Sequence, residues 1–143
     1  MLVDTLLKAK GYEVLTITPD TTVYAALVLM DTKNIGSLLV MSDEKIVGIF
    51  SERDYARKIV LKGKVSKDTP VREVMTTPVC VVDKGKTLDE CMAVMTAKRV
   101  RHLPVVEDGK LIGIVSIGDA VKSIIDEKAH EIEHLIDYIH GSY

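Results

Sequence analysis

The chain contains an internal repeat, and this repeat limits most strongly how the chain can fold. Sliding the sequence by 65 positions aligns Ile17–Val60 with Val82–Ile125 without a gap. Identical pairs include Thr22/Thr87, Met30/Met95, Leu38/Leu103, Val40/Val105, Gly48/Gly113, Ser51/Ser116 and Asp54/Asp119. Each copy is too short to bury its apolar faces alone. We therefore expect two copies of one supersecondary unit, packed on each other about a pseudo-twofold axis.

Hydrophobic periodicity, with Thr22 and Thr87 as helix caps, predicts the same order of elements in both copies: strand, helix, strand, strand, helix. The predicted fold class is α+β, with two βαββα repeats and short N- and C-terminal helices. For the first copy we expect a strand over 13–18, a helix over 22–33, a hairpin of 38–41 with 46–50, and a helix from 53 or 54 to 61. For the second copy we expect a strand over 79–82, a helix over 87–98, a hairpin of 103–106 with 111–115, and a helix from 118, with a break near 126 as an alternative.

The predicted domain organisation follows from these elements. The first repeat occupies 12–62, a polar linker with a short helix beginning at Thr69-Pro70 occupies 63–76, and the second repeat occupies 77–125. A helix over Val3–Lys10 precedes the repeats, and a C-terminal helix over 126–143 follows them, ended by Gly141. Both repeats are expected to form one module.

One motif closes each repeat and carries most of the functional argument. Gly48-Ile49-Phe50-Ser51-Glu52-Arg53-Asp54 returns as Gly113-Ile114-Val115-Ser116-Ile117-Gly118-Asp119. An apolar pair after glycine predicts the end of a buried strand, and Ser-x-x-Asp predicts the capped start of a helix. Backbone N–H groups at such a junction can hold an anion. Alternatively, the carboxylates only stabilise the helix dipole and the serines only cap the helices. Both this interpretation and ligand binding stay open.

Composition excludes several classes of protein. The chain has 143 residues, 47% of them apolar, a net charge of −2 and a pI near 6.1, which argues against nucleic acid as the main partner. It has no apolar run long enough to span a membrane, and its N-terminus lacks a basic signal-peptide start, so we expect a cytoplasmic protein. Cys80 and Cys91 lack metal-type spacing and are expected to be small core residues.

Two strand-helix-strand-strand-helix units that each end in Gly-apolar-apolar-Ser-x-x-Asp resemble the paired cystathionine-β-synthase (CBS) domains of a Bateman module. The resemblance covers about Tyr12 to Ile125, and the segment Arg101-His102-Leu103-Pro104-Val105 stands at the expected place before the second motif. No catalytic domain is attached, so the chain resembles a free-standing CBS pair. Such pairs typically bind adenine nucleotides in two clefts between the repeats and associate as homodimers.

The resemblance implies which residues would bind AMP, ADP or ATP. An aspartate at a helix start can accept both hydroxyls of a ribose, and the serine can bond ribose or phosphate. For the first cleft it implies Asp54, Ser51, Val79, Cys80, Val81, Arg101, His102 and Pro104, with the base near 79–81 and the phosphates near 101 and 102. For the second it implies Asp119, Ser116, Thr16, Ile17, Ile35, Gly36 and Ser37. Because Gly36-Ser37 replaces Arg101-His102, the second cleft is expected to bind its ligand more weakly, or to rely on Arg53, Lys33 or Arg99. In the alternative interpretation, Arg101 and His102 form only a solvated strand edge.

Three functional classes follow. The first is a regulatory module that binds adenine nucleotides and modulates a partner, without covalent cofactor or enzymatic activity. The second is a protein-interaction subunit with empty clefts or with S-adenosylmethionine, NAD or a metal ion. The third, remote class rests on His130-Glu131-Ile132-Glu133-His134, which matches H-E-x-x-H, a zinc-binding pattern. Ile132, Leu135, Ile136 and Ile139 form an apolar face there, which favours a helix whose charged face is solvated.

Overall fold

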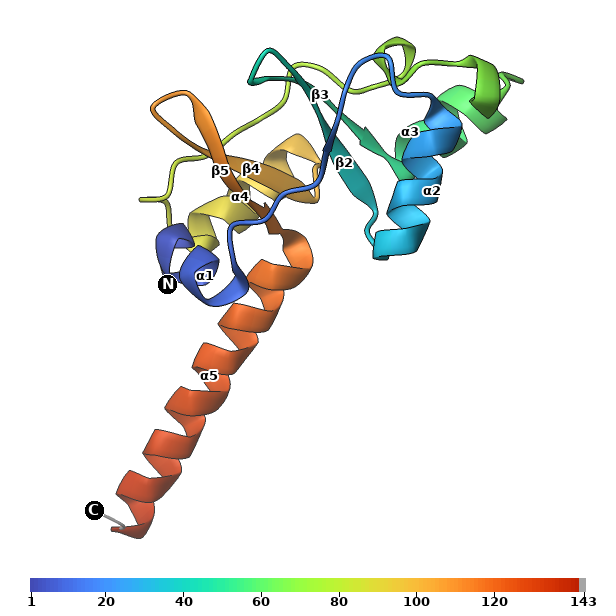
Figure 1. Ribbon diagram of the computed structural model, residues 1–143. Coiled ribbons are helices and arrows are strands. Elements are labelled where there is room, and N and C mark those ends of the chain that lie inside the picture. Colours follow the sequence, from blue (N-terminus) through green and yellow to red (C-terminus); the bar gives the residue numbers. More distant parts are fainter. Residues whose placement is uncertain (142–143) are drawn as a thin grey trace. The chain divides into compact units, whose positions relative to one another are not determined.

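A computed structural model describes residues 1–141, and its elements follow the predicted order closely (Figure 1). Its helices and strands, in chain order, are α1 (Val3–Lys10), β1 (Thr16–Ile17), α2 (Val23–Lys33), β2 (Ser37–Ser42), β3 (Lys45–Ser51), α3 (Glu52–Asp54), a π-helix (Tyr55–Val60), 3₁₀ turns at Ser66–Asp68 and Val71–Glu73, α4 (Leu88–Lys98), β4 (His102–Glu107), β5 (Lys110–Ser116) and α5 (Ile117–His140). The mixture of helices and strands confirms the α+β class.

The chain divides into two compact units, which do not coincide with the two repeats. The first unit, here called unit 1, contains Met1–Tyr12, Val82–Val106 and the chain from Gly113 on. The second, unit 2, contains Glu13–Val81 and Glu107–Ile112. The N-terminal helix α1 thus belongs to the unit that holds most of the second repeat.

Unit 2 is built around a sheet in the order β1-β2-β3, with β1 parallel and β3 antiparallel to β2. Ser37 is the partner of Ser51, so the beginning of β2 lies beside the end of β3. The β2–β3 turn has positive φ at both Asp43 and Glu44, as a tight two-residue hairpin requires. The buried core joins α2, the sheet and the 3₁₀ turns through the residues Val23, Ala26, Met30, Leu38, Val40, Phe50, Ile59, Val71 and Val74.

Unit 1 joins the N-terminus to the second repeat by backbone hydrogen bonds. The Leu88 N–H donates to the Met1 carbonyl at 2.9 Å, and the Val3 N–H donates to the Lys86 carbonyl at 2.8 Å. Leu7 is fully buried and lies against Gly113 of β5. A side chain at position 113 would collide with Leu7, so glycine is what allows α1 to approach β5.

Capping explains why the long helices begin where they were predicted to begin. The Thr22 side chain accepts from the Ala25 N–H at the start of α2. Thr87 and Glu90 form a reciprocal capping box at the start of α4. These local hydrogen bonds depend on residues three positions apart, which is why the sequence alone predicted them.

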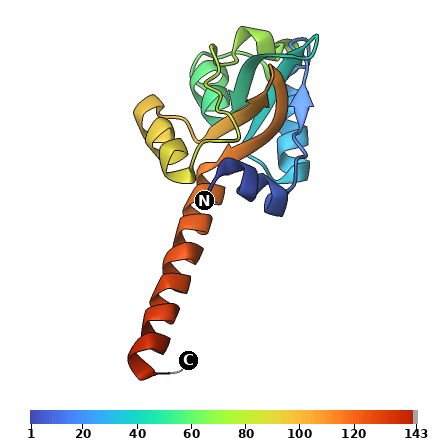
Figure 2. The same cartoon turned by 90° about the vertical axis from the view of Figure 1, so that its left-hand side faces the viewer.

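Four predicted elements were wrong in extent or type. The strand expected over 13–18 has only two residues, and the strand expected over 79–82 is absent from the described chain, with Val82 making an isolated bridge to Val105. The helix after Asp54 continues as a π-helix, and the helix expected from Pro70 is a 3₁₀ turn. The helix expected from 118 is confirmed, because α5 runs from Ile117 to His140 without the alternative break near 126 (Figure 2).

Candidate functional site

In unit 2, the first motif forms the junction between β3 and α3. The Ser51 hydroxyl accepts a hydrogen bond from the Asp54 N–H at 3.3 Å, and Asp54 Oδ2 accepts from the Ser51 N–H at 3.0 Å. This is a capping box, the local structure that Ser-x-x-Asp predicts. The motif therefore holds its carboxylate rigidly at the end of a buried strand.

The second oxygen of Asp54 is held by residues that sequence analysis did not single out. Thr76 Oγ1 donates to Asp54 Oδ1 at 2.8 Å, and Lys58 Nζ lies 3.0 Å from the same oxygen. Lys58 also donates to the Val74 carbonyl at 2.9 Å. With only 5% of Asp54 exposed, its negative charge is compensated inside unit 2. A ribose that bonded Asp54 Oδ1 would have to replace or share these donors.

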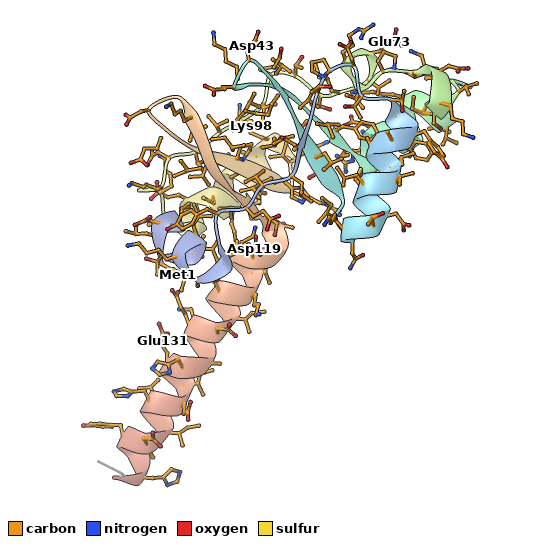
Figure 3. All side chains as sticks on the ribbon, viewed as in Figure 1. Met1, Asp43, Glu73, Lys98, Asp119 and Glu131 are labelled. Carbon is orange, nitrogen blue, oxygen red and sulfur yellow. The ribbon has the colours of Figure 1, made fainter. Side chains whose placement is uncertain are left out.

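In unit 1, the second motif forms the equivalent junction between β5 and α5, where Asp119 lies at the start of the helix (Figure 3). The Ser116 hydroxyl accepts from the Asp119 N–H at 3.0 Å, and Asp119 Oδ2 accepts from the Ser116 N–H at 3.1 Å. The Asp119 side chain is 26% exposed, compared with 6% for that of Asp54. Asp119 is thus the more accessible of the two motif carboxylates.

A lysine from the N-terminal segment binds Asp119. Lys10 Nζ donates to Asp119 Oδ2 at 2.6 Å and to the Ile114 carbonyl at 2.8 Å. Burial of the Asp119 carboxyl acts to raise its pKa, but hydrogen bonds from Lys10 and Ser116 outweigh burial and lower the pKa below its usual value of 3.8. Asp119 is therefore ionised at neutral pH and paired with a cation 109 positions away in the sequence.

Each junction is tied to the residue just before the first hairpin strand of the same repeat. The Glu52 N–H donates to the Gly36 carbonyl at 3.2 Å, and the Ile117 N–H donates to the Arg101 carbonyl at 2.8 Å. These bonds, together with the serine caps, use N–H groups at each helix start inside the protein. They also bring Gly36 to the first motif and Arg101 to the second.

Unit 1 therefore gathers Arg101, His102, Ser116 and Asp119 around Lys10. Burial lowers the pKa of His102 below its usual value of 6.5, and the charge of Lys10 adds to this effect. His102 is accordingly neutral near pH 7, while Lys10 and the exposed Arg101 carry positive charge. Pro104, also in unit 1, is buried, and its carbonyl accepts from the Val82 N–H at 3.0 Å.

The other predicted site residues lie in unit 2. They are Thr16 and Ile17 on β1, Ile35, Gly36 and Ser37 at the start of β2, Ser51 and Asp54 at the first motif, and Val79, Cys80 and Val81 after the 3₁₀ turns. Ser37 is buried and Thr16 is exposed. Each cleft predicted from the sequence draws residues from both units, and that pairing stays a prediction.

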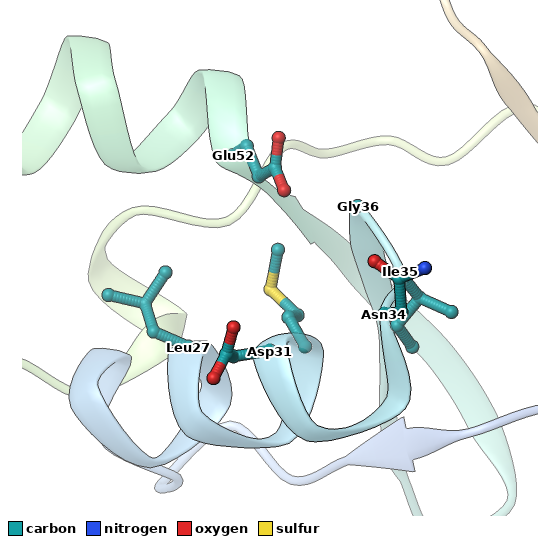
Figure 4. A pocket seen from close by; sticks show the side chains of 7 residues that line it. Leu27, Asp31, Asn34, Ile35, Gly36 and Glu52 are labelled. Carbon is teal, nitrogen blue, oxygen red and sulfur yellow. The ribbon is translucent and has the colours of Figure 1, made fainter.

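Unit 2 also contains a pocket of about 350 Å³ beside the first motif (Figure 4). Its lining residues are Leu27, Met30, Asp31, Asn34, Ile35, Gly36 and Glu52. Figure 4 shows Glu52 on one side, and Leu27 and Asp31 of α2 on the other. Two carboxylates make this pocket unfavourable for a phosphate and better suited to an uncharged or cationic group. Of its residues, the sequence had indicated only Ile35 and Gly36.

Among residues 1–141, no group of three or more His, Cys, Asp or Glu side chains is arranged to hold a metal ion. Within the same range, no helix combines the length and apolar character needed to cross a bilayer. Cys91 is buried, as predicted, whereas Cys80 is half-buried.

Two α+β repeats, each ending in a capped aspartate at a strand-to-helix junction, define a tandem-repeat module. The family model for the CBS domain matches residues 9–61 and 71–126. The chain is 41% identical over 132 residues to the mitochondrial CBS domain-containing protein CBSX3 of Arabidopsis thaliana, covering 88% of this chain and 64% of that protein. This protein belongs to the CBS-domain family, with two CBS domains in one chain.

Solved structures show the same fold. The CBS domain protein NE2398 is 53% identical, with a TM-score of 0.84 over 87% of this chain and 98% of that one. A CBS-CP12 protein from bloom-forming cyanobacteria, described as hexameric, is 27% identical, with a TM-score of 0.74 over 85% of this chain and 69% of that one. A CBS pair is a regulatory module, and CBS proteins form oligomers.

Proposed function

We propose that this CBS pair senses adenine nucleotides, namely AMP, ADP or ATP, and modulates a partner protein. The observation that carries the proposal is the duplicated junction, in which Ser51 with Asp54, and Ser116 with Asp119, form the same rigid carboxylate site. A single capped aspartate is explained by helix capping alone. Two in register, in a family of regulatory modules, favour a shared ligand-binding role.

The chemistry of the two junctions suits a ribose phosphate. An ionised carboxylate accepts two hydroxyl hydrogen bonds, and the vicinal hydroxyls of ribose supply two donors. Near Asp119, Lys10 supplies positive charge, whereas in the Asp54 cleft Arg101 would supply it for phosphate groups. In the proposed clefts, Asp54 works with 79–81, Arg101, His102 and Pro104, and Asp119 works with Thr16, Ile17 and 35–37.

Sensing requires that the nucleotide bind one conformation of the module more tightly than another. In the proposal, the bound nucleotide bridges the two repeats and alters the surface that the partner protein contacts. We further propose that the module acts in the cytoplasm as a homodimer. Cell fractionation and solution mass measurements check these two statements.

Calorimetric titration with AMP, ADP, ATP, NAD and S-adenosylmethionine tests the proposal. We expect Asp119→Asn and Asp54→Asn each to weaken nucleotide binding at their own cleft about tenfold or more, because each removes a charged acceptor. Glu90→Gln is the matched control: Glu90 is also the carboxylate of a capping box, but it starts α4 and lies outside the motif. Circular dichroism verifies that each variant is folded.

The titration also separates the main alternative. Folded wild-type protein that binds none of the three adenine nucleotides would refute the proposal. Binding of only S-adenosylmethionine or NAD would favour a different adenosyl ligand. Nucleotide binding unaffected by both aspartate substitutions would show that the motif carboxylates serve only as helix caps.

A further inference from the structure

The C-terminal part of α5 exposes an apolar stripe that one lysine, Lys128, interrupts. Counting from Val121, the stripe positions follow a strict alternation of four and three residues. They are Val121, Ile125, Lys128, Ile132, Leu135 and Ile139. Ile125 is 60% exposed, Ile132 58%, Leu135 59% and Ile139 76%. In both ribbon views this part of α5 extends away from the remainder of unit 1 (Figures 1 and 2).

The spacing of the stripe is that of a coiled-coil seam. Steps of four and three average 3.5 residues, the heptad period, with isoleucine at the a positions 125, 132 and 139. The stripe covers 18 residue steps, which is about 27 Å along the helix axis at about 1.5 Å per residue. The opposite face carries His130, Glu133, His134 and Asp137, all exposed. A helical partner of similar length would cover the apolar face, and the polar face suits solvent.

We propose that α5 pairs with α5 of a second copy of this chain as a short antiparallel coiled coil. In an antiparallel register that places Val121 opposite Ile139 of the second copy, each layer of the seam contains one stripe residue from each helix. Ile125 then faces Leu135 of the second copy, and Lys128 faces Ile132. One stripe thus matches itself over its full length, as a twofold symmetric interface requires.

Charge selects the antiparallel direction over the parallel one. In a parallel pair, Lys128 would face Lys128 of the second copy inside the seam, and two like charges would repel. In the antiparallel pair, Lys128 lies near Glu131 of the second copy, because both flank the middle of the seam. Lys128 already pairs with Glu131 of its own helix at 3.4 Å, so the two helices together would form a compact charge network. The flanking residues Ala129 and Ile136 add no charge.

This inference rests on the homodimer proposed above and names its interface; because that surface is separate from the motif junctions, it does not depend on nucleotide binding. Sedimentation equilibrium or light scattering across a concentration series, with EDTA present to exclude metal bridging through His130 and His134, measures the assembly. We expect the wild-type mass to rise reversibly from one chain to two. Ile132→Glu and Leu135→Glu should each raise the dimer dissociation constant about tenfold or more, since each places a charge in the seam.

The matched control is His134→Glu, which places the same side chain on the polar face of the same helix. It should leave the dissociation constant unchanged. A wild-type protein that stays monomeric at all concentrations would overturn the proposal. A dimer that Ile132→Glu and Leu135→Glu leave intact would also overturn it, while leaving a homodimer through another surface in place.

Disulfide trapping tests the direction of pairing. In a Cys80→Ser background, in which the remaining Cys91 is buried on α4, single cysteines are placed at Ile139 or Val121. Antiparallel pairing predicts that a mixture of Val121→Cys and Ile139→Cys chains cross-links on oxidation, while Ile139→Cys alone does not. Efficient cross-linking of Ile139→Cys alone would show parallel pairing and refute the proposed geometry.

Discussion

Replacing Gly113 by alanine tests how the N-terminal helix packs on the second repeat. A Cβ atom at position 113 would lie 2.7 Å from Leu7 Cδ2 and 2.9 Å from Leu7 Cδ1, and 3.3 Å from Leu7 Cγ. Ordinary contacts of a Cβ begin at 3.4 Å. Leu7 is fully buried, so its methyl groups cannot move into solvent to relieve the overlap.

Two opposing effects determine the size of the change. Forcing an extra methyl group into a packed core costs about 1–3 kcal/mol. Gly113 lacks a positive φ, so alanine fits its backbone and should regain about 0.4–1 kcal/mol by restricting the unfolded chain. The overlap is the larger effect, and we expect Gly113→Ala to lower the free energy of unfolding by about 1–2 kcal/mol.

A double-mutant cycle with Leu7→Ala isolates the contact. Leu7→Ala alone should cost about 2–5 kcal/mol, because it leaves a cavity between α1 and β5. In that background the new methyl group has space, so Gly113→Ala should be neutral or stabilise by up to about 1 kcal/mol. Urea unfolding followed by far-UV circular dichroism is the suitable assay, since the chain has no tryptophan.

Gly118→Ala is the control for the cycle. It lies in the first turn of α5, where the nearest atom to a Cβ would be Ser116 Oγ at 3.7 Å, so alanine should not destabilise the protein. An equal cost of Gly113→Ala with leucine or alanine at position 7 would refute the packing of α1 on β5.

Two further predictions concern the motif carboxylates. The lowered pKa of Asp119 means that its ion pair with Lys10 stabilises the fold above about pH 3.8, and that this contribution is lost as the pH falls through the folded-state pKa. Asp119→Asn should therefore make the free energy of unfolding fall less steeply at acid pH. An unchanged slope would contradict the pairing. Thr76→Val removes a donor to buried Asp54 and should cost about 1–3 kcal/mol in urea unfolding. A Thr76→Ser variant, which keeps the hydroxyl, should recover most of that loss, and failure to do so would indicate that Thr76 contributes by packing alone.

Local signals were the reliable part of the sequence analysis. Thr22, Thr87, Ser51 and Ser116 all cap the helices for which they were predicted, because a cap depends on hydrogen bonds between residues three positions apart. Both hairpins also formed where expected. The strand expected over 79–82 failed, because a strand exists only where a neighbouring strand pairs with it along its length.

The partners of the motif carboxylates had no local signal. Lys10 reaches Asp119 from the other end of the chain, and Thr76 reaches Asp54 from the linker. The Lys58 contact, four positions after Asp54, could have been anticipated from helical spacing. The pocket that contains Glu52 and Asp31 likewise arises from two elements distant in sequence.

The sequence by itself determined the duplication, the α+β class and the capped motif at each junction. It also indicated the family, which the comparisons confirmed. These follow from residue patterns repeated at fixed spacing and from hydrogen bonds within a single turn. Only the tertiary structure decided that α1 belongs with the second repeat and that Lys10 neutralises Asp119. Those outcomes depend on contacts between segments far apart in the chain, and a local sequence pattern does not show which distant segments will meet.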